Sequence, residues 1–182
     1  NILEFTVPIV GTTRLVSHCW SPKAKRELLD TYTHKPKVKR PPKNPKQEYE
    51  ASYYVSEDGW YGIPALSFKN SAVQACRYDG VGLVKVSTRK PKMREDLVRI
   101  GMGKPDLRYR GEYNKWKAEL KIQVNANILT ESQIYFLFEY AGHHVGVGEG
   151  RPSAPRSTMD WGRFKLDEDK MGQFTSKLEA VA

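Results

Sequence analysis

Residues 116–124, WKAELKIQV, decide the fold of this chain. Apolar and polar residues alternate along the segment without interruption, and its apolar positions are Trp116, Ala118, Leu120, Ile122 and Val124. Successive side chains of a strand point to opposite faces of its sheet, so this alternation predicts a strand that is buried on one face only. The sheet that contains it is therefore expected to have a covered face and an open one.

The segments after this strand predict a helix and a last strand. Thr130 and Gln133 occupy the two positions of a capping box, which begins an apolar helix that Gly142 closes. A glycine-rich loop comes next, and residues 161–166, WGRFKL, have the composition of a short strand. The C-terminal half of the chain is thus expected to fold as strand, helix and strand.

The segments before it predict further strands and a helical insertion. Residues 2–10 are apolar and β-branched enough for a strand, and residues 21–30 open with Ser-Pro, a common helix start. Residues 52–63 predict a hairpin whose turn contains Gly59.

The middle of the chain predicts a helix, a strand and a basic region. Residues 64–78 have helical spacing, with Phe68, Ala72, Ala75 and Cys76 on one face. A strand is expected over residues 81–86. Residues 85–110 form a second basic region, with nine bases and three acids. Within it, Lys104, Arg108 and Arg110 either extend a phosphate-binding track or belong to an ordinary solvated loop.

Together these elements predict an α+β fold. With residues 21–63 set aside as an insertion, the remaining order is the βαββαβ of a ferredoxin-like, or RRM-like, fold. Its antiparallel sheet carries both helices on one face and leaves the other face available to a ligand. We expect one domain over residues 1–182, an insertion that contains a basic arm (35–46) and the hairpin (52–63), and a polar tail at 167–182.

The chain is basic, with 30 Lys and Arg against 21 Asp and Glu and a net charge of +9. Residues 35–46, KPKVKRPPKNPK, contain six of the positive charges, four prolines and no acidic residue. Proline and like-charge repulsion exclude a core helix or a central strand, so a flexible or polyproline-like arm is expected. Such a segment is either solvated or bound to a polyanion, and its candidate phosphate contacts are Lys35, Lys37, Lys39, Arg40, Lys43 and Lys46.

A second candidate site follows Gly142. Glycines stand at three alternate positions, Gly146, Gly148 and Gly150, and Arg151 and Arg156 come directly after them. Glycines spaced in this way permit positive φ angles and leave N–H groups bare for an anion, and arginine adds a forked phosphate ligand. The alternative is a tight turn between helix and strand. A dinucleotide fingerprint is excluded because the loop follows a helix.

Residues 62–77, GIPALSFKNSAVQACR, resemble the helix entry of the repeat-associated mysterious protein (RAMP) superfamily, which pairs it with a glycine-rich loop before the last strand. The chain also resembles small phage proteins with a Pro- and Lys-rich arm. RAMP proteins include subunits of CRISPR effector complexes; they have an RRM-like ferredoxin fold and bind RNA, often by polymerising along it. The resemblance implies phosphate contacts from Lys69 and Arg77 on the helix. It also implies that the loop and strand edge beside the nucleic acid contain Gly146, Gly148, Gly150, Arg151 and Arg163.

These features favour a non-enzymatic protein that binds single-stranded RNA or DNA along its backbone, with little sequence preference. The family resemblance implies a homo-oligomer or a larger nucleoprotein complex. Aromatic residues beside the basic arm are candidates for base stacking, namely Tyr53, Tyr54, Trp60 and Tyr61. Alternation along a hairpin predicts that about half of them belong to the core instead.

Two other functions remain open. His143 and His144 are candidate acid and base groups of a metal-independent RAMP-type endoribonuclease, or simply polar loop residues. The third function is a phage structural or inhibitory protein that docks an acidic partner. Cys19 and Cys76 belong to no CxxC motif, which predicts no metal site and a reducing compartment. We expect no cofactor and no membrane partner, and the cytoplasm of a bacterial host cell as the setting.

Overall fold

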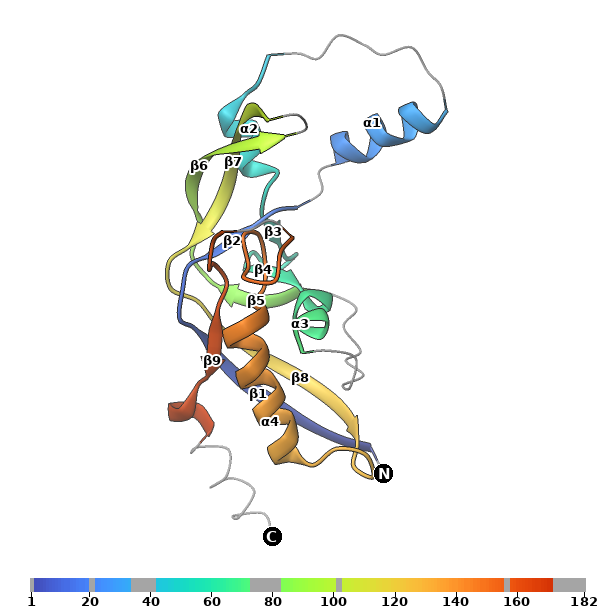
Figure 1. Cartoon of the computed structure of the whole chain (residues 1–182), viewed down its shortest axis with the longest axis vertical. Coiled ribbons are helices and arrows are strands. Elements are labelled where there is room, and N and C mark those ends of the chain that lie inside the picture. Colours follow the sequence, from blue (N-terminus) through green and yellow to red (C-terminus); the bar gives the residue numbers. More distant parts are fainter. Residues whose placement is uncertain are drawn as a thin grey trace.

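The computed structural model describes residues 2–19, 22–33, 42–72, 83–100, 103–155 and 158–171. These residues form an α+β fold, and their strands lie in three antiparallel sheets of three strands each (Figure 1).

The first sheet has the order β8-β1-β9 and consists of β8 (Lys117–Asn125), β1 (Ile2–Gly11) and β9 (Phe164–Leu166). In its register Val7 lies opposite Leu120 and Ile9 opposite Ala118. Along β8 the apolar side chains are buried, while lysine and glutamate side chains between them are exposed. The alternation predicted for residues 116–124 is confirmed.

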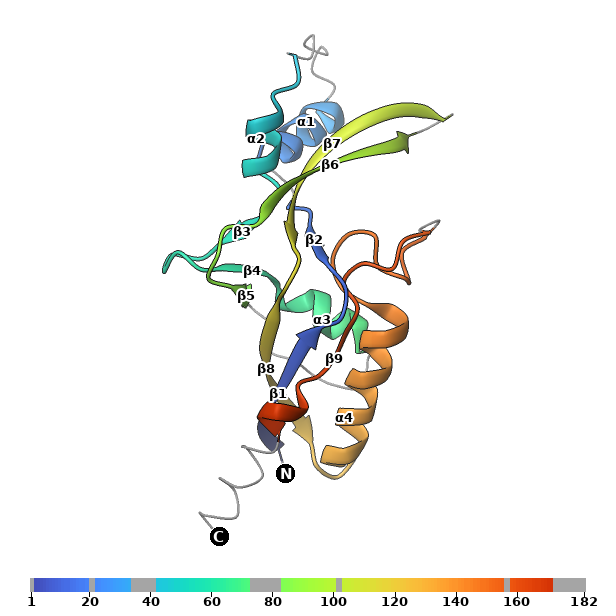
Figure 2. The ribbon, with the colours of Figure 1, turned by 90° about the vertical axis from the view of Figure 1, so that its left-hand side faces the viewer.

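Helices α3 (Ala65–Ser71) and α4 (Glu131–Tyr140) lie on the same side of this sheet (Figure 2). Their inward side chains join the sheet in one core that includes Phe68, Ile134 and Phe138. The capping box of α4 is confirmed, because Thr130 Oγ1 accepts a hydrogen bond from the Gln133 N–H and Gln133 Oε1 accepts one from the Thr130 N–H.

The end of α4 differs from the prediction. The helix passes into a single π-helical turn, η1 (Ala141–Val145), and the glycine that ends the turn is Gly146, with φ of +68°. Gly142 lies inside η1, packed so closely on Phe164 that no Cβ would fit. Its lack of a side chain is required by the approach of β9, and it does not close the helix.

The second sheet contains β3 (Tyr54–Val55), β4 (Tyr61–Pro64) and β5 (Leu83–Ser87) in that order. The predicted hairpin is confirmed, and Gly59 in its turn has φ of +78°. Strand β5 lies beside β8 without pairing with it. The described strands therefore form split three-stranded sheets, and the single continuous sheet of a ferredoxin-like fold is not confirmed.

No sequence pattern predicted the third sheet. It has the order β2-β7-β6, with β2 (Leu15–Ser17), β7 (Lys104–Tyr113) and β6 (Lys92–Ile100), and Figure 2 shows β6 and β7 projecting from the body as a long hairpin. The sequence predicted no strand between residue 86 and Trp116, and the solvated loop considered for Lys104, Arg108 and Arg110 is wrong, because all three belong to β7. Both faces of this hairpin carry charged residues, so the apolar alternation that normally identifies a strand is absent.

The insertion is partly helical. Helix α1 (Pro22–Tyr32) confirms the short helix expected there, and it extends away from the other described elements (Figure 1). Helix α2 (Pro45–Glu50) packs on β7, and Asn44 caps it by accepting a hydrogen bond from the Gln47 N–H at 3.2 Å. The last two residues of the predicted arm thus belong to a helix. Proline is compatible with this position because the first N–H groups of a helix have no partner within it.

Several expectations fall outside the described residues: the arm before residue 42, the helix beyond residue 72, and the tail beyond residue 171. Within the described part, Phe68 and Ala72 are buried as predicted, and residues 168–171 form one helical turn. No helix of the described part is both long and apolar enough to cross a bilayer.

Candidate functional site

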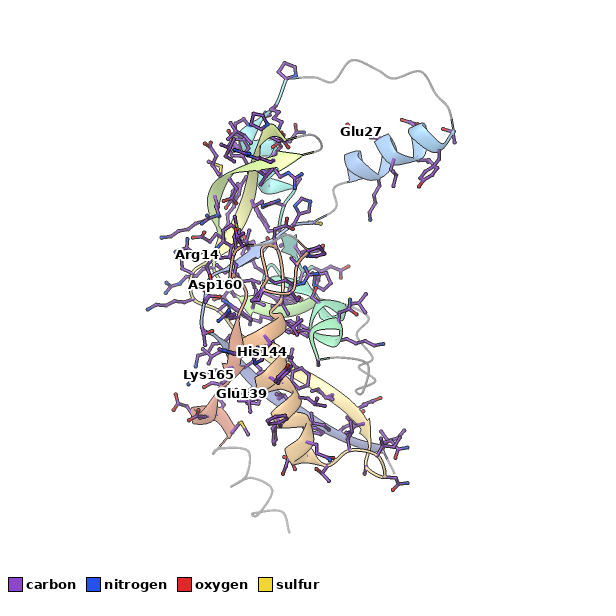
Figure 3. The ribbon with its side chains drawn as sticks, in the orientation of Figure 1. Arg14, Glu27, Glu139, His144, Asp160 and Lys165 are labelled. Atoms are coloured by element: carbon purple, nitrogen blue, oxygen red, sulfur yellow. The ribbon has the colours of Figure 1, made fainter. Side chains whose placement is uncertain are left out.

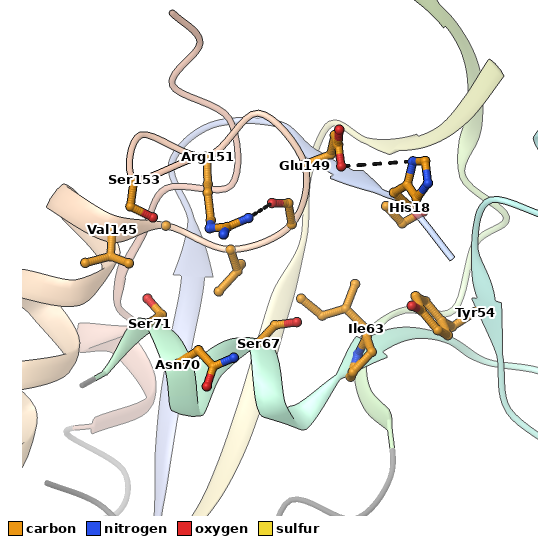
Figure 4. Close-up of a pocket in the computed structure, with 15 residues that line it drawn as sticks. His18, Tyr54, Ile63, Ser67, Asn70, Ser71, Val145, Glu149, Arg151 and Ser153 are labelled. Atoms are coloured by element: carbon orange, nitrogen blue, oxygen red, sulfur yellow. Dashed lines mark hydrogen bonds and ion pairs between the residues drawn. The ribbon is translucent and has the colours of Figure 1, made fainter. Parts of the chain in front are cut away.

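A polar pocket of about 350 Å³ opens between α3 and residues 145–153, here called the glycine loop (Figure 4). The loop forms one wall, α3 and the end of β4 form the opposite wall, and the residues after β2 complete it. Most of its side chains are hydrogen-bonding groups, among them His18, Ser67, Asn70, Ser71, Glu149 and Arg151.

The three glycines of the loop have positive φ angles, +68° at Gly146, +77° at Gly148 and +64° at Gly150, as their spacing predicts. They also allow the loop to lie against the rest of the protein. A Cβ on Gly148 would lie 2.7 Å from the Val16 carbonyl oxygen, and one on Gly150 would lie 2.5 Å from the Trp161 ring. Glycine is therefore required by packing as much as by the backbone conformation.

The backbone N–H groups of the loop are largely used within the protein. Gly146 donates to the Ala141 carbonyl at 2.9 Å, Val147 to Gly162 at 3.0 Å, and Glu149 to Val16 at 2.9 Å. The expectation of bare donors is wrong for Gly146.

Arg151 is the cation of the pocket. Its side chain turns inward toward α3 (Figure 4). Nη1 donates a hydrogen bond to the carbonyl of Gly148 in the same loop at 3.1 Å. The Ser153 N–H donates to the Val145 carbonyl at 3.3 Å, which holds the arginine segment against the end of η1. The half-buried guanidinium keeps further N–H groups for a ligand, because one arginine has five donors.

Glu149 is the carboxylate of the pocket, and it is held by two basic residues. One oxygen lies 2.9 Å from Nη2 of Arg110, and the other lies 4.0 Å from Nδ1 of His18. Burial lowers the pKa of His18, and the attraction of Glu149 opposes that shift. Because Arg110 compensates Glu149, the pocket carries little net negative charge.

Arg110 belongs to a network of ion pairs that extends across the third sheet. It lies 3.7 Å from Asp96, which also accepts a hydrogen bond from Arg94 at 2.7 Å. Arg94 donates in addition to Glu112 at 2.6 Å and stacks on the Trp161 ring at 4.3 Å. No sequence signal indicated this network, because its members meet only when β6 lies beside β7 and the glycine loop packs on them.

The suggested phosphate track of residues 104–110 is therefore wrong at Arg110, which is only 4 % exposed and already paired. Arg108 lies 3.5 Å from Asp106. Lys43, a candidate of the basic arm, bonds to the same aspartate and to the Leu107 carbonyl. Lys43 therefore connects the insertion to β7.

The other predicted phosphate ligands are dispersed. Lys46 is exposed on α2, and Lys69 is half-buried on α3, next to the pocket residue Asn70. Arg163 is half-buried, and its N–H donates to Thr13 Oγ1 at 3.0 Å. Outside the described residues lie Lys35, Lys37, Lys39, Arg40, Arg77 and Arg156.

The four aromatic residues proposed for base stacking are all half-buried. The Tyr53 ring packs edge-on against Tyr49 and Tyr61, with centroids 5.2 and 5.6 Å away. Tyr54 lines the pocket, where burial raises the pKa of its hydroxyl to about 12. The Trp60 ring lies over Gly62, and a Cβ added to Gly62 would lie 2.9 Å from that ring. Tyr53 and Tyr61 thus pack on each other, and Tyr54 is the one of the four that lines the pocket.

His143 and His144 are exposed on η1 and do not line the pocket. Their ring centroids are 4.7 Å apart, and His144 lies 4.3 Å from the Tyr140 ring. The histidine that the fold brings into the pocket is His18. No sequence signal marked it, because its carboxylate partner is far along the chain.

Among the described residues, no group of three His, Cys, Asp or Glu side chains is arranged to hold a metal ion. No protein-family model matches the sequence, and no curated protein is significantly similar to it.

Proposed function

We propose that this protein binds single-stranded nucleic acid along its phosphate backbone, with little sequence preference, and that the glycine-loop pocket receives one phosphate of the strand. The observation that carries the proposal is the pocket itself. Arg151 points into a recess of about 350 Å³ that also contains serine, asparagine and tyrosine side chains, and the one carboxylate among its lining residues is paired with a buried arginine.

The charge of the whole chain supports the same proposal. A net charge of +9 attracts a polyanion from a distance, and the arm brings six cations into one segment. A recessed site favours a single strand over a duplex, because a flexible strand can turn one phosphate inward.

The proposed family is the RAMP superfamily, in a modified form. Support comes from the strand order β8-β1-β9, from β5 beside β8, and from two helices on one side of the sheet. A ferredoxin-like sheet built from these strands has the order β9-β1-β8-β5. The arrangement corresponds to that sheet with the hydrogen-bonded pairing between β8 and β5 lost. The glycine loop joins the second of these helices to the last strand, as in that family. We further propose self-association along the strand.

The decisive experiment is fluorescence anisotropy with labelled single-stranded RNA, single-stranded DNA and duplex DNA at two salt concentrations. We expect the single strands to bind more tightly than the duplex. If four cations contact phosphates, log K falls with log salt at a slope of about −3. The proposal would be refuted if the protein bound none of the three nucleic acids at low salt. The ratio of nucleic-acid to protein absorbance in the purified sample, measured before and after nuclease treatment, tests the proposal independently, because it detects nucleic acid that copurifies with the protein.

A second candidate function is the metal-independent endoribonuclease, and one observation supports it. The pocket contains His18 beside Glu149, which is the minimal pairing of an imidazole with an orienting carboxylate. Incubation with labelled RNA in EDTA tests it. Cleavage that is lost in His18→Ala would identify His18 as the essential group, cleavage that is lost in His143→Ala or His144→Ala would identify the η1 pair, and intact RNA would refute the enzyme.

A protein partner is the remaining alternative. A complex with an acidic protein would survive nuclease treatment, whereas a nucleoprotein assembly would dissociate. Light scattering after size exclusion, with and without nuclease, separates the two.

A further inference from the structure

The glycine-loop pocket is larger than a phosphate requires. Its volume of about 350 Å³ lies within the range of sites that enclose a small molecule, about 300–1,000 Å³. The phosphate group assigned to Arg151 fills only a small part of this space. Because a nucleotide carries a sugar and a base next to its phosphate, the rest of the pocket is available to them.

The pocket has two chemically different ends (Figure 4). Arg151 lies toward the end nearer to η1, where Ser71 and Ser153 also line the pocket. Toward the other end lie Glu149 of the glycine loop and Tyr54 of β3. One end therefore offers a cation, and the other offers a carboxylate and an aromatic ring.

Glu149 keeps one oxygen for a ligand. Oε1 accepts a hydrogen bond from Arg110 at 2.9 Å, whereas Oε2 lies 4.0 Å from His18 Nδ1, which is beyond hydrogen-bonding distance. Arg14, on the loop before β2 (Figure 3), does not fill this position, because it bonds to Glu112 at 3.3 Å. Oε2 is thus able to accept a hydrogen bond, and as an oxygen of an ionised carboxylate it cannot donate one.

Tyr54 places an aromatic ring at the same end. Its backbone is held in β3, and its hydroxyl is hydrogen-bonded to Cys19. Of the four hairpin aromatics it alone lines the pocket, while Tyr53 and Tyr61 pack on each other. An aromatic ring beside a phosphate site is able to stack a base, whichever base it is.

We propose that the pocket takes one whole nucleotide of the bound strand and selects a base with an exocyclic amino group, which means cytosine, adenine or guanine over thymine or uracil. This inference rests on the proposed function and adds a base-contacting end to the same site. An amino group donates to Oε2 of Glu149, whereas thymine and uracil present a carbonyl oxygen that the carboxylate repels. Tyr54 stacks the base without choosing among bases. Because one nucleotide of the strand is selected, the preference over a mixed sequence stays small.

The test compares single-stranded oligomers of deoxycytidine and deoxyuridine of equal length, because these pyrimidines differ in having an amino group or a carbonyl at the same ring position. Anisotropy at pH 7.5 measures both affinities for the full chain. A third oligomer contains deoxycytidine whose amino group is dimethylated and so has no N–H to donate. This comparison of ligands uses the wild type alone and does not depend on the stability of any variant.

The variants test the two residues separately. Glu149→Gln replaces the carboxylate by an amide that both donates and accepts, Tyr54→Ala removes the ring, and Tyr54→Phe keeps it. Tyr32→Ala removes an exposed ring of α1 as a matched control. Thermal unfolding checks that each variant is folded, since Glu149→Gln also weakens the pair with Arg110.

We expect the wild type to bind the deoxycytidine oligomer about ten-fold more tightly than the deoxyuridine oligomer. The dimethylated oligomer should bind like deoxyuridine, and Glu149→Gln should abolish the preference. Tyr54→Ala should weaken both oligomers by about five-fold or more and leave their ratio unchanged. Tyr54→Phe and Tyr32→Ala should behave like the wild type.

Equal affinity of the wild type for deoxycytidine and deoxyuridine would overturn the inference and leave the proposed function intact. A preference for deoxycytidine that persists in folded Glu149→Gln would overturn it as well, because another group would then select the base. A wild type that binds none of the oligomers would refute the proposed function, and the inference with it.

Discussion

Arg110 and Glu149 form an ion pair at 2.9 Å, so a cation buried in β7 holds the one carboxylate among the described residues that line the glycine-loop pocket. The two residues belong to segments with separate sequence signals, the basic region of residues 85–110 and the glycine loop. Their pairing connects the third sheet to the pocket and removes a negative charge from its lining. The stability of the fold and the chemistry of the site therefore depend on the same contact.

Replacement of Arg110 by methionine should destabilise the protein strongly. The side chain is 4 % exposed, and its removal leaves Asp96, itself 7 % exposed, and Glu149 without their shared cation. Breaking a buried pair on one side costs about 3–5 kcal/mol. Urea unfolding measures the loss. Arg108→Met is the matched control, because its pair with Asp106 is more exposed and should contribute about 1 kcal/mol or less. Equal effects of the two substitutions would contradict the prediction.

Gly148→Ala and Gly59→Ala should differ although both glycines have nearly the same φ, +77° and +78°. A Cβ on Gly59 meets nothing within 4 Å, so only the strain of a left-handed residue remains, about 1–2 kcal/mol. A Cβ on Gly148 would also lie 2.7 Å from the Val16 carbonyl oxygen, and the backbone must move. We expect a clearly larger loss of unfolding free energy for Gly148→Ala. Comparable losses would show that the loop does not pack on β2 in this way.

Arg151→Ala should weaken nucleic-acid binding uniformly across sequences. Loss of one phosphate contact on a single strand changes the slope of log K against log salt by about 0.7. Anisotropy titrations at several salt concentrations measure both quantities. Lys25→Ala, which removes an exposed cation from α1, is the control and should leave the slope nearly unchanged. An unchanged slope in Arg151→Ala would show that Arg151 contacts no phosphate, which contradicts a phosphate site in the pocket.

His18 should make the fold less stable in acid. Burial lowers its pKa in the folded state below 6.5, its usual value, so at a pH just below that value the unfolded chain binds a proton that the folded chain does not. This destabilisation by His18 is absent at pH values above the pKa of the unfolded chain, and it grows as the pH falls toward the lower pKa of the folded protein. Urea unfolding of wild type and His18→Asn at pH 7.5 and pH 5.5 tests this. The wild type should lose more stability between the two pH values, and an equal loss in both proteins would contradict the lowered pKa.

Local signals predicted the elements whose chemistry is local. The strand β8 follows from strict alternation, α4 from the pairing of Thr130 with Gln133, and the first hairpin from the turn at Gly59. Each of these depends on residues within a few positions of one another, and the structure confirms all three.

The third sheet could not be recognised in the same way. Arg94, Asp96 and Arg110 face one another inside the hairpin, where strands usually carry apolar residues. Their charges are acceptable there because they pair with one another and with Glu112 across the two strands, and Arg110 pairs in addition with Glu149 of the glycine loop. A pattern based on hydropathy assigns such residues to solvent, so the sequence predicted no strand there.

By itself, then, the sequence determined the half-buried strand, the capped helix, the hairpin turn and the need for glycine after the second helix, because periodicity, caps and positive φ are properties of short segments. Only the tertiary structure decided which charges are buried, which histidine enters the pocket, and which aromatic residues remain exposed. Those outcomes depend on contacts between residues far apart in the chain, such as Arg110 with Glu149. The glycines show both levels at once: their spacing predicted the backbone conformation, and the approach of Val16 and Trp161 decided that the loop packs inward, with the Arg151 side chain directed into the pocket (Figure 4).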